Sequence, residues 1–314
     1  MKEFVINKTN ENQRFDKYLK RILPAASNAF IYKMLRKKNI ELNEKRAKGD
    51  EILKCGDKIK IFFSDETYLK MSSSVTQGAF EDYSAAYKAL KGIEVVFEHE
   101  DFMIVYKPSG ILSQKNGNTP SLNEWCLGYL IDRNIISEDS LKEFKPSVLN
   151  RLDFNTEGLV ICSKTLKGSR RLSDMLNKRT LKKYYHAVCS GNCDLNGVYK
   201  AFLSKDSKTN KVTVYDNKEK IPSHVKYSPI STGVKVISSG KETSELEIEL
   251  ITGKSHQIRA HLAYLGFPLI GDIKYNLDAK KTSSGQELKA YKIVFPAFDE
   301  KDEWFSLSEK TIKC

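Results

Sequence analysis

The chain has 314 residues, of which 40% are hydrophobic and 29% charged, with 17 glycines and 8 prolines. This composition excludes collagen-like, low-complexity and wholly disordered chains, and the length fits about two globular domains at ~150 residues each. The net charge of +12 lies mostly at the front, because residues 1–63 hold 16 Lys and Arg against 8 Asp and Glu. A basic N-terminal segment followed by a nearly charge-balanced remainder predicts a polyanion-binding module joined to a second functional domain, although a solvated basic surface would have the same composition.

The six cysteines are spread along the chain, which argues against a disulfide scaffold. Cys189 and Cys193 lack a second cysteine or histidine pair at zinc-finger spacing, so no metal site is expected there. No apolar run approaches the roughly 18 residues that a transmembrane helix needs, and the first residues lack the apolar centre of a secretion signal. We therefore expect a cytoplasmic protein without membrane contact.

The first 63 residues predict a small α+β module. Apolar residues recur at helical spacing from Arg14 to Leu35, and Pro24 divides this run into two helices. Short strands are expected after it, around turns. The end of the second helix carries basic residues that can face phosphates, namely Lys33, Arg36, Lys37 and Lys38. The order of Arg14-Phe-Asp16, Ile40-x-Leu-Asn43 and Gly56-Asp57-x-Ile59 resembles the RNA-binding domain of ribosomal protein S-four, which implies an RNA-binding domain over residues 1–63.

Residues 64–92 are expected to form a linker, because Ser, Thr, Tyr and Lys predominate without a steady period apart from a helical pattern at Tyr83 to Leu90. Residues 93–314 are expected to form the second domain. Its predicted strands are 93–97, 102–106, 159–163, 184–189, 212–215, 234–237 and 246–251, and its predicted helices are 122–131, 167–177 and 255–265. Strands dominate and helices interrupt them irregularly, which favours an α+β domain with a mixed, largely antiparallel sheet.

Three segments of this domain carry candidate functional residues. The polar loop from Asn150 to Gly158 contains Asp153, although an Asp in such a loop is most often a turn or capping residue. Its opening is similar to a calcium-binding loop, but Lys164 stands where a bidentate Glu is required. In the strand around Tyr185, alternation places this residue on one face with Ala187 and Cys189, and a packing role is the ordinary interpretation.

The third segment runs from a strand end at Thr252-Gly253 into a helix that Ser255 can cap. Ile258, Leu262 and Leu265 mark the buried stripe of this helix. Arg259 lies at the margin of that stripe, and on this pattern alone a solvated helix face, with Arg259 and His261 merely exposed, is the ordinary interpretation.

Together these segments resemble the RluA-type pseudouridine synthases over roughly 220 residues. The matching motifs occur in the family's order: Lys107-Pro-Ser-Gly110, Arg151-Leu-Asp153-x-x-Thr156-x-Gly158, Lys183-x-Tyr185-x-Ala187, and Gly253-x-x-His256-Gln257-x-Arg259-x-His261 followed by Gly271-Asp272. The chain departs from the family at Asn150, where His is usual, and at Lys254-Ser255, where Arg-Thr is usual. Asn150 leaves open which hydrogen bonds support the neighbouring aspartate.

The resemblance implies an enzyme that detaches uracil from ribose, turns it and rejoins it through carbon, without metal or cofactor. It implies Asp153 as the catalytic carboxylate, Arg259 as its ionic partner and Tyr185 as a residue stacking on the flipped-out base. It further implies substrate contacts from Arg151, Thr156, His256 and Gln257. The expected substrate is large-subunit ribosomal RNA, with transfer RNA as the other candidate, and family analogy favours a monomer. The alternative is a non-catalytic RNA-binding or ribosome-assembly factor on the same fold; a metal-dependent RNA hydrolase would need a ligand cluster.

Overall fold

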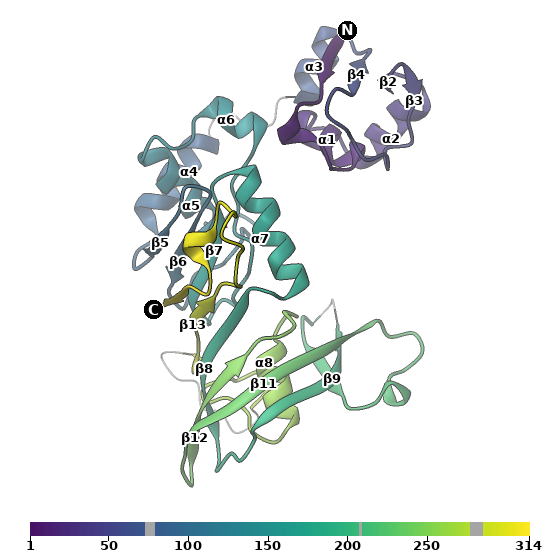
Figure 1. The fold of residues 1–314 in the computed structure, drawn as a ribbon. Helices are drawn as coiled ribbons and strands as arrows, with labels where there is room; N and C mark the ends of the chain where they lie inside the picture. The colour runs from purple at the N-terminus through teal and green to yellow at the C-terminus, as the bar shows by residue number, and fades with distance from the viewer. Residues whose placement is uncertain (73–78, 207–208, 277–284) are drawn as a thin grey trace. The chain divides into compact units, whose positions relative to one another are not determined.

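The computed structural model describes residues 1–72, 79–206, 209–276 and 285–314 of the chain (Figure 1). The chain folds as two compact units. One comprises Met1–Tyr87, Leu127–Pro146 and Thr165–Lys167, and the other comprises Lys88–Cys126, Ser147–Lys164 and Gly168–Cys314.

The first 63 residues form a small sheet and two helices around a core of their own. The elements are β1 (Lys2–Val5), α1 (Phe15–Ile22), α2 (Asn28–Arg36), β2 (Ile40–Leu42), β3 (Lys45–Arg46) and β4 (Lys58–Ile61), with the antiparallel strand order β1-β4-β2-β3. Phe15, Leu19, Ile31 and Leu35 are buried in the core between these elements. The break between the two helices at Pro24, predicted from the sequence, is confirmed. The basic residues predicted to face RNA are all exposed at the end of α2, namely Lys33, Arg36, Lys37 and Lys38.

The segment expected to be a linker contains two helices, α3 (Asp65–Ser72) and α4 (Ala79–Ala89). The helical pattern at Tyr83 to Leu90 predicted most of α4. The sequence gives only a weak signal for α3, because none of its residues is fully buried and only Tyr68 and Met71 pack, partly buried, against the core of the first 63 residues.

One large sheet organises the second unit in the described part of the chain. Its strands are β5 (Glu94–Glu98), β6 (Phe102–Lys107), β7 (Glu157–Ser163), β8 (Lys182–Ser190), β9 (Gly197–Lys205), β10 (Val212–Tyr215), β11 (Tyr227–Ser239), β12 (Thr243–Glu249), β13 (Leu288–Val294) and β14 (Thr311–Lys313). They run in the order β10-β9-β11-β12-β8-β13-β7-β6-β5, with β14 paired to β13. All neighbours are antiparallel except β7 and β13, which confirms the predicted mixed, largely antiparallel α+β fold.

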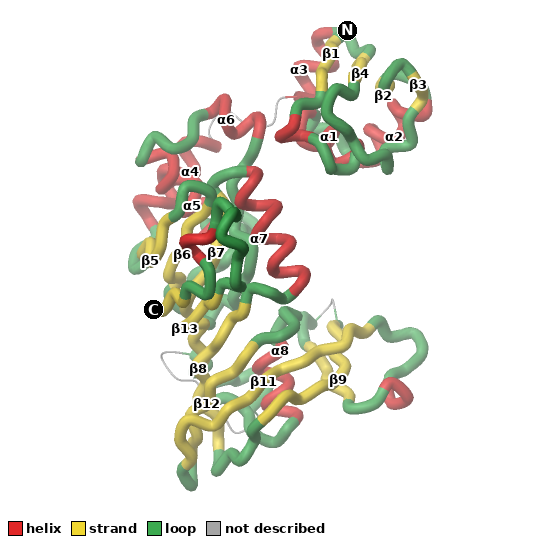
Figure 2. The backbone as a smooth tube through the Cα atoms, in the orientation of Figure 1, coloured by secondary structure: helices red, strands yellow, loops and turns green. Residues whose placement is uncertain are grey.

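Figure 2 shows these strands in yellow side by side, with α8 (Gln257–Tyr264) lying against β11. Ala260 of α8 packs with apolar residues of the neighbouring strands, including Leu203, Val214 and Ile230. The remaining helices are α5 (Leu122–Asp132), α6 (Glu138–Glu143) and α7 (Leu166–Lys178). Among the described helices, none is both long and apolar enough to cross a bilayer.

The parallel contact between β7 and β13 depends on one glycine. Gly158 pairs with Ala290 across the two strands, at φ +122°. A Cβ at this position would lie 2.2 Å from the Ala290 carbonyl oxygen, so only glycine allows the strands to approach this closely. This contact fixes the strand that directly follows the loop of Asp153.

Candidate active site

A pocket of about 900 Å³ opens in the second unit, where the loop of Asp153, the start of β8 and the residues leading into α8 come together. Asp153, Tyr185 and Arg259, which lie far apart in the sequence, all line it. Two lining residues are acidic, whereas eight are basic: Arg151, Arg179, Lys182, Lys183, Lys205, Lys254, Arg259 and Lys274. Such a surface favours a polyanion at the mouth of the pocket.

The guanidinium of Arg259 joins two carboxylates at the pocket wall. Its Nη1 donates to Oδ2 of Asp153 at 2.8 Å, while its Nε and Nη2 donate to the two carboxylate oxygens of Asp272, each at 2.8 Å. The side chain of Asp272 is fully buried, and that of Asp153 is 27% exposed. Although burial opposes the charged form, Asp272 and Asp153 together raise the pKa of Arg259. Asp272 thus holds the guanidinium through Nε and Nη2, and Nη1 remains to bind the partly exposed carboxylate of Asp153.

The loop carrying Asp153 is held by hydrogen bonds on both sides of that residue. The Ser113 hydroxyl donates to the Leu152 carbonyl at 2.8 Å and accepts the Leu152 amide at 3.0 Å. The Asp153 carbonyl accepts the Thr156 amide at 3.1 Å. Asn150, which replaces the usual family histidine, accepts the Ile161 amide of β7 at 2.8 Å. Its amide therefore supports the loop without contacting the Asp153 carboxylate.

Lys107, at the end of β6, is the further support of this loop. Its ammonium donates to the carbonyls of Pro108, Ile111 and Phe154 at 2.9, 2.8 and 3.3 Å. The side chain is fully buried, and burial lowers its pKa to about 8, opposed by the charges of Asp153 and Glu157. The sequence analysis placed Lys107 in a turn motif and gave it no role. The sequence does offer a signal for such a role, because a single lysine ends the apolar strand Phe-Met-Ile-Val-Tyr-Lys.

Tyr185 lies on the buried face of β8 with Ala187 and Cys189, as strand alternation predicted. Tyr185 lines the pocket, while only 5% of the residue is exposed. Burial, and then the charge of Asp153, raise the pKa of its hydroxyl. The phenol is therefore protonated at neutral pH and can donate a hydrogen bond.

Helix α8 begins differently from the sequence expectation. Its N-cap is His256, in the left-handed conformation at φ 54°, so Ser255 does not cap it. The helix is buried from Gln257 to Leu262, which excludes the solvated face considered for Arg259 and His261. His261 contacts the Thr232 hydroxyl at 3.0 Å, and burial lowers its pKa to about 4.

Two residues predicted to contact substrate, Gln257 and Thr156, line the pocket and are also hydrogen-bonded within the protein. The Gln257 amide donates to Ser231 and Thr232 and accepts from Thr252 and Lys254, which uses all four of its hydrogen-bonding positions.

Thr156 is 2% exposed and accepts a 2.7 Å bond from the Gln286 amide. These bonds hold the side chains of Gln257 and Thr156 in place at the pocket, and their contact with substrate stays a prediction. Arg151 is exposed at the pocket, and His256, also at the pocket, bonds to the Tyr275 hydroxyl at 2.8 Å.

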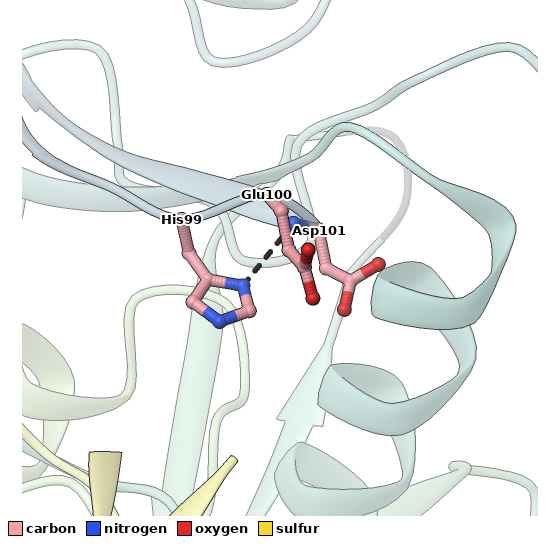
Figure 3. A group of neighbouring side chains, drawn as sticks. All are labelled: His99, Glu100 and Asp101. Carbon is pink, nitrogen blue, oxygen red and sulfur yellow. Dashed lines mark hydrogen bonds between the residues drawn. The ribbon is translucent and has the colours of Figure 1, made fainter. Parts of the chain in front are cut away.

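A second group of ionisable residues lies outside the pocket, in the turn between β5 and β6 (Figure 3). The ligand atoms of His99, Glu100 and Asp101 lie within 4.8 Å of one another. His99 Nδ1 accepts the Asp101 backbone amide at 3.1 Å, and the Asp101 carboxylate accepts the Trp304 indole at 3.1 Å. These contacts hold the turn and the core, and we assign no metal to the group.

Comparison with known proteins identifies the class of this protein. Residues 101–264 match the family described as RNA pseudouridylate synthase. An uncharacterized RNA pseudouridine synthase of Mycoplasma genitalium is 31% identical over 304 residues, which cover 95% of this chain and 90% of that protein. The ribosomal large subunit pseudouridine synthase C of Rickettsia felis is 29% identical over 84% of this chain and 82% of its own. Among solved structures, human RNA pseudouridylate synthase domain containing 4 shares the fold, with a TM-score of 0.51 and 18% identity over 72% of this chain and 95% of that one.

The protein is therefore an isomerase that acts on RNA, not a non-catalytic factor. It belongs to the RNA pseudouridine synthases of the RluA superfamily.

Sequence reasoning missed Asp272 as a site residue. Gly271-Asp272 was visible as a motif, but nothing local shows that its carboxylate faces Arg259.

Proposed function

We propose that this enzyme isomerises a uridine of large-subunit ribosomal RNA, turned out into the pocket, with Asp153 as the nucleophile. The observation that carries the proposal is the ion pair between Asp153 and Arg259 in a pocket with basic walls. The ribosomal target is supported by the name of the Rickettsia felis relative. Transfer RNA is the second candidate, and the cytoplasm is the proposed location.

The reaction requires an anionic carboxylate in a poorly solvated site. The bond from ribose C1′ to uracil N1 breaks, C1′ bonds to C5, C5 loses its hydrogen and N1 gains one, so the product is an isomer. Arg259 stabilises the Asp153 anion through its 2.8 Å contact, and Asp272 prevents the guanidinium from turning away. Asp153 is thereby available to attack the base or the sugar.

In this proposal Tyr185 packs against the flipped uracil. Its raised pKa favours a role as a stacking surface and hydrogen-bond donor over that of a general base. Tyr185→Phe is expected to keep most of the activity and Tyr185→Ala to lose it. Loss of activity in Tyr185→Phe as well would make the hydroxyl the essential part.

The central test is Asp153→Asn, which retains the shape of the side chain but removes its charge. Activity is measured as tritium release from [5-³H]uridine-labelled RNA, extracted from cells that lack the gene. Asp153→Asn is expected to bind this RNA and release no tritium, and appreciable turnover would refute the nucleophile. Mapping pseudouridine in ribosomal and transfer RNA before and after incubation then identifies the target.

We also propose that residues 1–63 bind RNA through the four exposed basic residues at the end of α2. Replacing all four by Gln is expected to flatten the dependence of log K on log salt, by at most about 0.9 for each phosphate that the protein no longer neutralises. The control replaces four lysines that are exposed elsewhere, Lys235, Lys241, Lys301 and Lys313. Equal slopes for the two variants would contradict the proposed RNA-binding surface.

A further inference from the structure

An exposed aromatic ring follows the proposed nucleophile directly. Phe154 lines the pocket together with Asp153, and 49% of the residue is exposed. Leaving so much apolar surface in water sacrifices the free energy that its burial would supply. Scattered exposed apolar residues are ordinary on protein surfaces, so the position of this ring carries more weight than its exposure.

The backbone of Phe154 is held firmly. Its carbonyl accepts the Gly110 amide at 2.9 Å and the Lys107 ammonium at 3.3 Å. The next carbonyl, of Asn155, accepts the Ser109 hydroxyl at 3.1 Å. The ring therefore projects from a fixed point on the loop, which lowers the entropy lost when a partner binds it.

The surroundings of the ring indicate the chemistry of that partner. Arg151, three residues earlier in the same loop, is exposed, and among the charged side chains of the pocket lining eight are basic and two are acidic. Fixed aromatic rings beside Lys and Arg form the usual surface for unpaired nucleic acid, in which the rings meet bases and the cations meet phosphates. A purely apolar partner would have to leave these charges without counterions.

We propose that Phe154 stacks on a nucleobase that adjoins the target uridine in the RNA. The inference rests on the proposed function, because it takes the nucleotide in the pocket to be the one beside Asp153. Phe154 binds the neighbour of the target and takes no part in the bond changes. Its contact is made equally in the ground state and the transition state, so it acts on KM and leaves kcat unchanged.

The test compares Phe154→Ala, Phe154→Leu and Phe154→Trp in the full-length chain. Tritium release is measured on [5-³H]uridine-labelled RNA from cells that lack the gene, as a function of RNA concentration. Phe305→Ala is the matched control, because Phe305 is 46% exposed and does not line the pocket. Thermal unfolding of every variant reports whether the fold is kept.

Phe154→Ala and Phe154→Leu are expected to raise the apparent KM about tenfold at constant kcat, which is the order of one base–aromatic stack. Phe154→Trp keeps an aromatic ring and is expected to keep the KM of the unmodified protein. The control is expected to keep the KM of the unmodified protein. The proposal is overturned if Phe154→Ala changes KM less than twofold, if Phe154→Leu equals the unmodified protein, or if kcat falls while KM stays constant. Turnover by Asp153→Asn would instead refute the nucleophile, and it leaves this comparison of KM values intact.

Discussion

The arrangement around Arg259 predicts that Asp272 is needed for the rate of the reaction although it does not line the pocket. In Asp272→Asn the side chain keeps its shape but loses its charge and one acceptor oxygen. The guanidinium is then no longer gripped through both Nε and Nη2, as it is by two 2.8 Å bonds in the structure. Its Nη1 should lose its alignment with Asp153.

The expected loss of stability follows from the burial of the pair. Removing one partner from a buried ion pair costs about 3–5 kcal/mol. Asn still accepts one hydrogen bond and Arg259 keeps Asp153, so we expect a loss of about 2–3 kcal/mol. A displacement of about 1 Å at a catalytic contact lowers the rate about 100-fold, and we expect kcat to fall by that order while KM changes little.

The assay is the rate of tritium release at saturating RNA, together with urea unfolding of the same preparations. Asp302→Asn is the control, because Asp302 pairs with Arg171 outside the pocket, with both side chains about a quarter exposed. Its kcat is expected to match that of the unmodified protein. If Asp272→Asn loses stability but retains kcat within threefold, the carboxylate is merely structural and the reasoning fails.

Two further predictions concern stability. His261 is neutral in the folded protein down to a pKa of about 4 but takes up a proton below about 6.5 when unfolded, so acidification from pH 6.5 to 4 should remove up to about 3 kcal/mol. Urea unfolding across that range should show a smaller loss for His261→Gln, and an identical loss would contradict the assignment. Gly158→Ala should destabilise the fold by about 3 kcal/mol or more, because its Cβ would lie 2.2 Å from the Ala290 carbonyl at a positive φ. Gly253→Ala, whose Cβ would have Lys183 Nζ 3.7 Å away, should shift thermal unfolding much less, and equal shifts would count against a steric cause.

The sequence by itself determined those helices and strands whose residues show a regular apolar spacing or a chain-breaking residue. Pro24 ended one helix, Val212 to Tyr215 formed the strand predicted over those residues, and alternation placed Tyr185 on the buried face of β8. Periodicity and chain breakers act over a few residues, which is why they can be read without the fold. The order of the motifs also identified the family and drew attention to Asp153 and Arg259.

The tertiary structure alone decided what those motifs touch. Asp272 binds the guanidinium of Arg259, and Gln257 and Thr156, both at the pocket, bond to Thr252 and Gln286 of the protein. The need for glycine at position 158 is explained only by the parallel pairing of β13 with β7. The partners of these side chains lie from a few to more than 100 residues away in the chain. Packing of the whole sheet decides which atoms meet, and a local sequence pattern contains no information about that packing.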